Sequence, residues 1–146
     1  MTPSPPFEAQ HPKYAESVAA SFAKQGLMRS IEAALVSVLP GAVEIALPYR
    51  NDLTQQHGAI HAGVITAIVD TACGYAALTL MPPDAEVVTV EYKVNFLAPA
   101  AGDRVIGRGQ VIRSGAELSV CRGEVVVTKD GEDTLVATML ATMLRV

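Results

Sequence analysis

The chain has 146 residues, of which 50% are hydrophobic and 18% are charged, and its formal net charge is -4. A chain of this length forms one domain with a substantial core. No cluster of lysine or arginine occurs, which argues against nucleic-acid binding. The first residues are rich in proline and do not resemble a signal peptide. We expect a single domain over residues 1–146, with residues 1–10 as a loose arm.

The cysteines, Cys73 and Cys121, form neither a CxxC motif nor a zinc-ligand spacing. We therefore expect reduced thiols and a cytoplasmic protein. No metal site is predicted, because the histidines form no ligand set at a known spacing; they are His11, His57 and His61.

A short amphipathic helix is expected from Pro12, which suits a first helical turn, to Gly26, which can cap the end. Its apolar residues recur at every fourth position, at Tyr14, Val18 and Phe22. Residues 27–31 can add a turn. Alternating apolar residues then predict a hairpin with strands at 34–39 and 43–47.

Residues 62–80 are nearly all apolar or small and are interrupted by one charge, Asp70. This pattern predicts a helix buried on all sides that ends before Pro82. The carboxylate, the glycines and the lack of flanking basic residues argue against a membrane span. A lone carboxylate in such a helix is costly unless it is paired, hydrogen-bonded or functional.

The face of the helix that carries Asp70 is otherwise built of small residues, namely Gly63, Thr66, Gly74 and Ala77. Either a neighbouring element packs closely there, with backbone donors holding the carboxylate, or a ligand approaches it. The polar stretch over residues 55–61 favours a functional role.

Four further strands are expected, over residues 87–97, 104–113, 117–129 and 134–145, with turns at Ser114-Gly115 and Asp130-Gly131. In the first of these, one apolar face is expected to consist of Val88, Val90, Tyr92, Val94 and Phe96. Gly107 and Gly109 share a face where a ligand or another backbone can approach, and Gly123 is expected to mark a bulge. The order predicts an α+β domain in which a curled antiparallel sheet surrounds one long helix.

Three stretches resemble hotdog-fold acyl-CoA thioesterases of the PaaI-like, phenylacetate-degradation branch: residues 55–77, 89–100 and 109–115. The motif of that family is an amide, five residues, His-Gly-Gly, and an acid nine residues after the histidine. Gln55, His61 and Asp70 have this spacing. Two departures are Ala62 in place of the first glycine and Gln55 where many relatives have asparagine. Within the branch, the sequence looks most like medium- and long-chain acyl-CoA thioesterases.

Thioester hydrolysis needs an activated water or nucleophile, and donors for the oxyanion. Asp70 is the acid available, as a general base or as a direct nucleophile. The N–H groups of Ala62 and Gly63 lie at the helix start and suit the thioester oxygen. The Gln55 amide either donates to the carbonyl or orders the loop. His61 either braces the loop or acts as an acid/base.

Gly63 and Asp70 are seven residues apart, roughly 10 Å along one helix, so one carbonyl cannot easily meet both. The resemblance implies that a dimer, or a dimer of dimers, shares each active site between two chains, with acyl-CoA as substrate. No cofactor is implied beyond the CoA part of the substrate. We expect neither a nucleic-acid nor a membrane partner.

The resemblance also implies that the hydroxyl of Thr89 assists the water used by the acid, and that Val88 and Val90 contact the substrate. The turn at Arg113, Ser114 and Gly115 matches one near the CoA phosphates. Thr89 as an ordinary strand residue and Arg113 as a solvated charge are the structural alternatives. Two other functions remain open: a hotdog hydratase or dehydratase, and a non-catalytic acyl-CoA-binding module.

Overall fold

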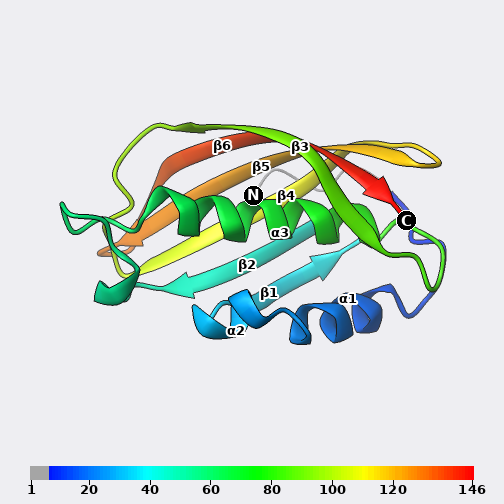
Figure 1. Cartoon of the computed structure of the whole chain (residues 1–146), viewed down its shortest axis with the longest axis horizontal. Coiled ribbons are helices and arrows are strands. Elements are labelled where there is room, and N and C mark those ends of the chain that lie inside the picture. The colour runs from blue at the N-terminus through cyan, green and yellow to red at the C-terminus, as the bar shows by residue number, and fades with distance from the viewer. Residues whose placement is uncertain (1–6) are drawn as a thin grey trace.

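A six-stranded antiparallel sheet curls around the long helix α3 (Ala62–Leu78) in this computed structural model, which describes residues 7–146 (Figure 1). The strand order is β1-β2-β4-β5-β6-β3. The strands are β1 (Ala34–Leu39), β2 (Ala42–Pro48), β3 (Val87–Phe96), β4 (Arg104–Ser114), β5 (Leu118–Lys129) and β6 (Glu132–Arg145). The expected α+β hotdog fold is confirmed.

Glycines in β4 and β5 let α3 lie directly on the sheet. A Cβ atom at Gly109 would lie 2.3 Å from the backbone carbon of Ala72, and one at Gly123 would lie 2.5 Å from a methyl carbon of Val69. The backbone of α3, and not a ligand, is therefore what approaches Gly109. The expected bulge at Gly123 is wrong, because Gly123 pairs regularly with Gly109 and the register shifts at Val125 instead.

Two short helices, α1 (Tyr14–Ala23) and α2 (Gly26–Ser30), precede the sheet. The expected cap at Gly26 is wrong: α1 ends at Ala23 and Gly26 begins α2. Residues 1–6 of the expected arm lie outside the described residues. Residues 7–10 are anchored, since Phe7 packs against the core and the Gln10 side chain donates to the Leu80 carbonyl at 2.9 Å.

Within residues 7–146, β3 is an edge strand that pairs with β6 alone, and its alternation is broken by a bulge between Thr89 and Glu91. Thr89 lies opposite the buried Met143 and therefore faces α3, so Val88 points to the other face of the sheet. The expectation of one apolar, buried face is wrong. The exposed large side chains of β3 are Val88, Val90, Tyr92 and Phe96.

Candidate active site

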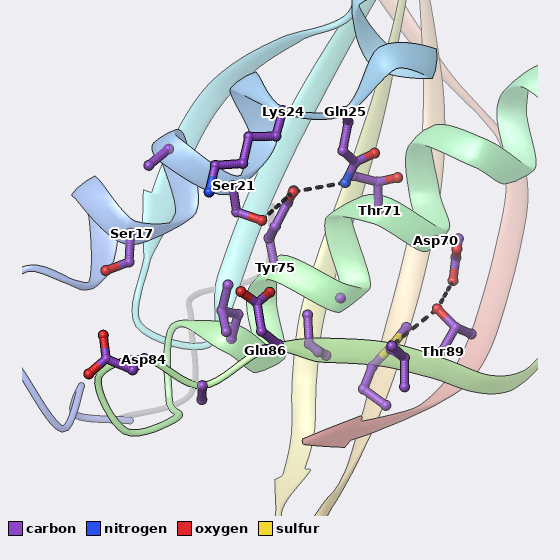
Figure 2. Close-up of a pocket in the computed structure, with 17 residues that line it drawn as sticks. Ser17, Ser21, Lys24, Gln25, Asp70, Thr71, Tyr75, Asp84, Glu86 and Thr89 are labelled. Carbon is purple, nitrogen blue, oxygen red and sulfur yellow. Dashed lines mark hydrogen bonds between the residues drawn. The ribbon is translucent and has the colours of Figure 1, made fainter. Parts of the chain in front are cut away.

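The carboxylate of Asp70 lies midway along α3 and is held by β3. The Thr89 hydroxyl donates a hydrogen bond to Asp70 Oδ1 at 2.8 Å (Figure 2). Burial raises the pKa of Asp70 above its ordinary value, and the bond from Thr89 lowers this pKa by a smaller amount. Strand β3 thus positions a partly desolvated acid that is hydrogen-bonded in its charged form.

The start of α3 is capped by a histidine. His61 is the N-cap residue, and its Nδ1 accepts from the Gly63 N–H at 2.8 Å. This bond agrees with a bracing role for His61 and engages one of the two expected oxyanion donors. The Ala62 N–H has no hydrogen-bond partner within the described part of the chain. Ala62 therefore presents the free donor at this helix end.

The Gln55 side chain orders the loop before α3. Its Oε1 accepts from the backbone N–H groups of His57 at 2.6 Å and Ala59 at 3.3 Å. An isolated bridge between Thr54 and Ile60 closes the same loop. Among residues 7–146, Gln55 Nε2 has no partner. The carbonyl half of the amide is thus structural, whereas its NH₂ half remains able to donate.

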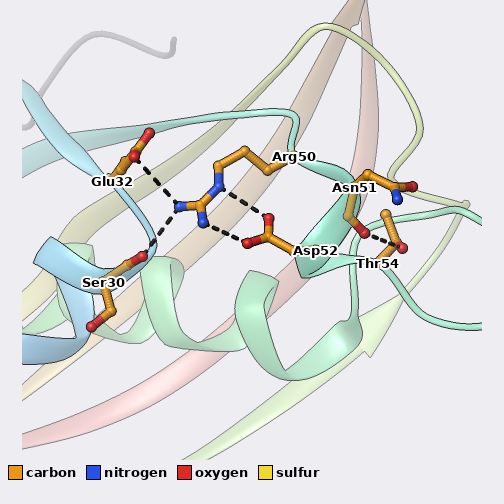
Figure 3. Close-up of polar contacts among 6 residues, drawn as sticks. All are labelled: Ser30, Glu32, Arg50, Asn51, Asp52 and Thr54. Atoms are coloured by element: carbon orange, nitrogen blue, oxygen red, sulfur yellow. Dashed lines mark hydrogen bonds and ion pairs between the residues drawn. The ribbon is translucent and has the colours of Figure 1, made fainter.

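An arginine that sequence reasoning missed joins this loop to the body of the domain. Arg50 donates from Nε and a terminal nitrogen to the carboxylate of Asp52, and from its other terminal nitrogen to the Ser30 carbonyl at 3.1 Å (Figure 3). Its hydrogen bond to Asp52 holds the pKa of that carboxyl below the ordinary value. The sequence signal, an Arg-x-Asp triplet, is too common to have indicated this role.

A hollow of about 400 Å³ between α3 and β3 brings the acid and the helix start together. Ala62, Gly63 and Asp70 line it from α3, and β3 contributes Tyr92, Val94 and Phe96. Along the helix, Ala62 and Asp70 are eight residues apart, or about 12 Å. Both groups thus face one hollow but stand too far apart to contact one thioester carbonyl.

Two further hollows adjoin this one. A cavity of about 590 Å³ on the α1 side includes Asp70, Thr89, Val88 and Gly74. A hollow of about 360 Å³ beside the helix start includes Gln55 and Ala62.

Other expected site residues stand apart. None of the three hollows includes Val90 or the turn formed by Arg113, Ser114 and Gly115. Ala77, expected on the same face of α3 as Asp70, is completely buried in the core.

Sequence reasoning also missed a polar cluster in the larger cavity, which Asp70 lines as well. The Tyr75 hydroxyl accepts from Gln25 Nε2 at 2.8 Å and lies 3.0 Å from Ser21 Oγ (Figure 2). These residues are 50 and 54 positions apart in the chain, so no local pattern joins them. The one signal was that Tyr75 is the single aromatic residue of α3.

A long helix enclosed by a curled antiparallel sheet is the arrangement of the hotdog fold. A family model described as the thioesterase superfamily matches residues 57–134. The chain therefore belongs to the thioesterase superfamily, and the expected membership in a hotdog-fold thioesterase family is confirmed.

Relatives agree with this assignment. The structure of a thioesterase family protein from Silicibacter pomeroyi is 46% identical, with a TM-score of 0.90 over 91% of this chain and 98% of that one. A Halobacterium salinarum protein, whose name proposes an esterase, is 32% identical over 120 residues, which are 77% of this chain and 79% of its own. The E. coli PaaI protein from the phenylacetic acid degradation operon shares the fold, at 21% identity and a TM-score of 0.82 over 92% of this chain and 94% of its own. No helix within residues 7–146 is long and apolar enough to cross a membrane.

Proposed function

We propose that the protein hydrolyses the thioester of a fatty or aryl acyl-CoA to the free acid and CoA, with Asp70 as the catalytic residue. The observation that carries this proposal is the hydrogen-bonded Asp70 carboxylate, which lines the same hollow as the unpaired Ala62 N–H. An acid and an oxyanion donor are the two elements that acyl transfer from sulfur requires. We place the activity in the cytoplasm, without a metal ion or a cofactor.

Asp70 can act by either of two routes. As a general base it removes a proton from a water, whose oxygen attacks the thioester carbon; the C–S bond then breaks and CoA leaves as a thiolate that takes up the proton. As a nucleophile its oxygen displaces the CoA thiolate to form an anhydride, which water then splits into the free acid and Asp70. In both routes the Ala62 N–H stabilises the oxyanion.

The separation of Ala62 from Asp70 supports a site shared between two protomers. The hollow that Ala62 and Asp70 line borders β3. Among the described residues, the outer edge of β3 has no partner strand, and its side chains Val90 and Phe96 are exposed. Such an edge invites pairing with another strand. A two-fold dimer through β3 would run the two α3 helices antiparallel and bring each helix start toward the acid of the other chain.

The test is release of free thiol from a panel of acyl-CoA esters by the wild type and by Asp70→Asn. We expect the variant to lose about 100-fold or more in kcat, because amide cannot act as base or nucleophile. Because burial raises the pKa of Asp70, its charge disfavours the folded state at neutral pH, so the variant should melt no lower than wild type.

Asp133→Asn, at an exposed carboxylate bonded to Thr128, is the matched control and should retain full activity. Near-normal turnover by Asp70→Asn would refute the assignment of the acid. Binding of the esters without thiol release would instead support a non-catalytic binding module, and loss or addition of water on an intact thioester would indicate a hydratase or dehydratase.

A further inference from the structure

The cavity on the α1 side of Asp70 lies between α1, the second half of α3 and the start of β3 (Figure 2). Its volume of about 590 Å³ is in the range of pockets that bind small molecules. Asp70 and Thr89 form part of its wall. A thioester attacked at Asp70 can therefore extend one of its two arms into this cavity.

The lining of this cavity is unusually polar for a ligand pocket, since such pockets are mostly apolar with few polar groups. Hydroxyl, amide and carboxylate groups come from Ser21, Gln25, Thr71, Tyr75, Asp84 and Glu86. In Figure 2, Asp84 and Glu86 lie across the cavity from α1. An alkyl chain placed here would remove water from these groups and return no hydrogen bond, which costs free energy.

Tyr75 presents a hydroxyl whose orientation is fixed by its neighbours. Its ring is buried and packs edge-on against Phe22, with centroids 6.2 Å apart. Its oxygen accepts from Gln25 and shares a hydrogen bond with Ser21. Whichever of the two hydroxyls donates, Tyr75 keeps one further hydrogen-bonding position, and Gln25 Oε1 has no partner within the described chain.

We propose that this cavity receives the acyl group and selects acyl groups that carry a hydroxyl, which hydrogen-bonds to Tyr75 and Gln25. Tyr75 follows Asp70 by five residues, which is roughly 7.5 Å along the helix axis, so the test below uses a hydroxyl at a similar reach from the thioester carbon. A site built to bond a hydroxyl discriminates against the analogue that lacks it, because its own polar groups are then left unpaired. This inference rests on the proposed acyl-CoA hydrolysis.

The experiment compares kcat/KM for two esters of equal size, 6-hydroxyhexanoyl-CoA and heptanoyl-CoA, which differ only by a terminal hydroxyl or methyl group. Wild type should prefer the hydroxylated ester about tenfold, as expected for one net hydrogen bond. Tyr75→Phe and Gln25→Leu should each bring the ratio close to one. Tyr14→Phe, which removes a tyrosine hydroxyl that does not line the cavity, should preserve the preference.

A ratio near or below one in wild type overturns the inference, as does a preference that survives in both Tyr75→Phe and Gln25→Leu. If Tyr75→Phe does not fold, Gln25→Leu decides. Calorimetric binding of the free acids, 6-hydroxyhexanoate and heptanoate, separates this inference from the proposed function. If no ester is hydrolysed, acyl-CoA hydrolysis is refuted, and tighter binding of the hydroxy acid that is lost in Gln25→Leu still supports the pocket. Equal or absent binding of the acids would then refute the pocket as well.

Discussion

Ala62 carries the unpaired N–H at the start of α3 and occupies the first helical position. Proline is tolerated at this position and lacks an N–H, and the preceding residue, His61, already has the extended ψ of 136° that proline requires. Ala62→Pro should therefore fold normally and lose about 100-fold or more in kcat, as expected for removal of an oxyanion donor.

Thiol release measures this effect, with Ala62→Ser, which keeps the N–H, as the control. Wild-type rates in a folded Ala62→Pro protein would show that the oxyanion donor lies elsewhere.

The hydroxyl of Thr89 should set the pH at which activity begins. Asp70 must be ionised to act as base or nucleophile, so kcat/KM should fall as the pH drops through its pKa, which burial raises. Thr89→Val removes the hydrogen bond that lowers this pKa. The acidic limb of the kcat/KM profile should therefore move to higher pH in the variant.

Thr142→Val is the matched control, because the Thr142 hydroxyl bonds to Glu91 and not to Asp70. An acidic limb that stays in place in Thr89→Val would mean that this hydrogen bond does not tune the reacting group.

The close packing of α3 against the sheet depends on the absence of a side chain at Gly109. Gly109→Ala would place a methyl group 2.3 Å from the backbone of Ala72, so helix and sheet must separate. We expect a loss of about 1–3 kcal/mol in the free energy of unfolding, measured by urea denaturation. Gly26→Ala is the control, since the new methyl group would meet nothing closer than 4.0 Å and alanine favours a helix. Equal stability of the two variants would contradict this packing.

In strand β3, the regular alternation of apolar residues in the sequence led to a wrong prediction of which side chains share a face. The apolar residues at even positions indicated one buried face, but the bulge after Thr89 changes the side to which later residues point. Thr89 and Tyr92 consequently both face α3, although residues three positions apart point to opposite faces in a regular strand. This change of phase is what places the Thr89 hydroxyl against Asp70.

The domain as a whole presents the free edge of β3 beside the hollow that holds Ala62 and Asp70. If two chains share each site, a mixed dimer of Asp70→Asn and Ala62→Pro has one site with both defects and one with neither. Co-refolding the two inactive variants should therefore restore up to half of wild-type activity per mixed dimer. Mixed dimers verified by mass that remain inactive would indicate a site contained within one chain.

Local patterns in the sequence were sufficient to predict the six strands and the buried helix. The motif formed by Gln55, His61 and Asp70 came from the family resemblance. Alternation, turn residues and an unbroken apolar run report directly on neighbouring residues, so they can be read without a structure. The two readings of Gly107 and Gly109 could not be separated in this way, because the sequence does not show which backbone covers a glycine. Folding resolved this question by laying α3 across them.

Contacts between distant residues depend on the tertiary structure. The bonds from Thr89 to Asp70 and from Gln25 to Tyr75 join residues 19 and 50 positions apart. The Gly63 N–H donates to His61 Nδ1, and this bond depends on the angle at which the loop enters the helix. It leaves the Ala62 N–H as the free donor. Residue types and spacing therefore singled out Asp70 and the start of the helix as candidates. Three-dimensional packing determined which hydroxyl holds the acid, which N–H remains free and what lines the adjoining cavity.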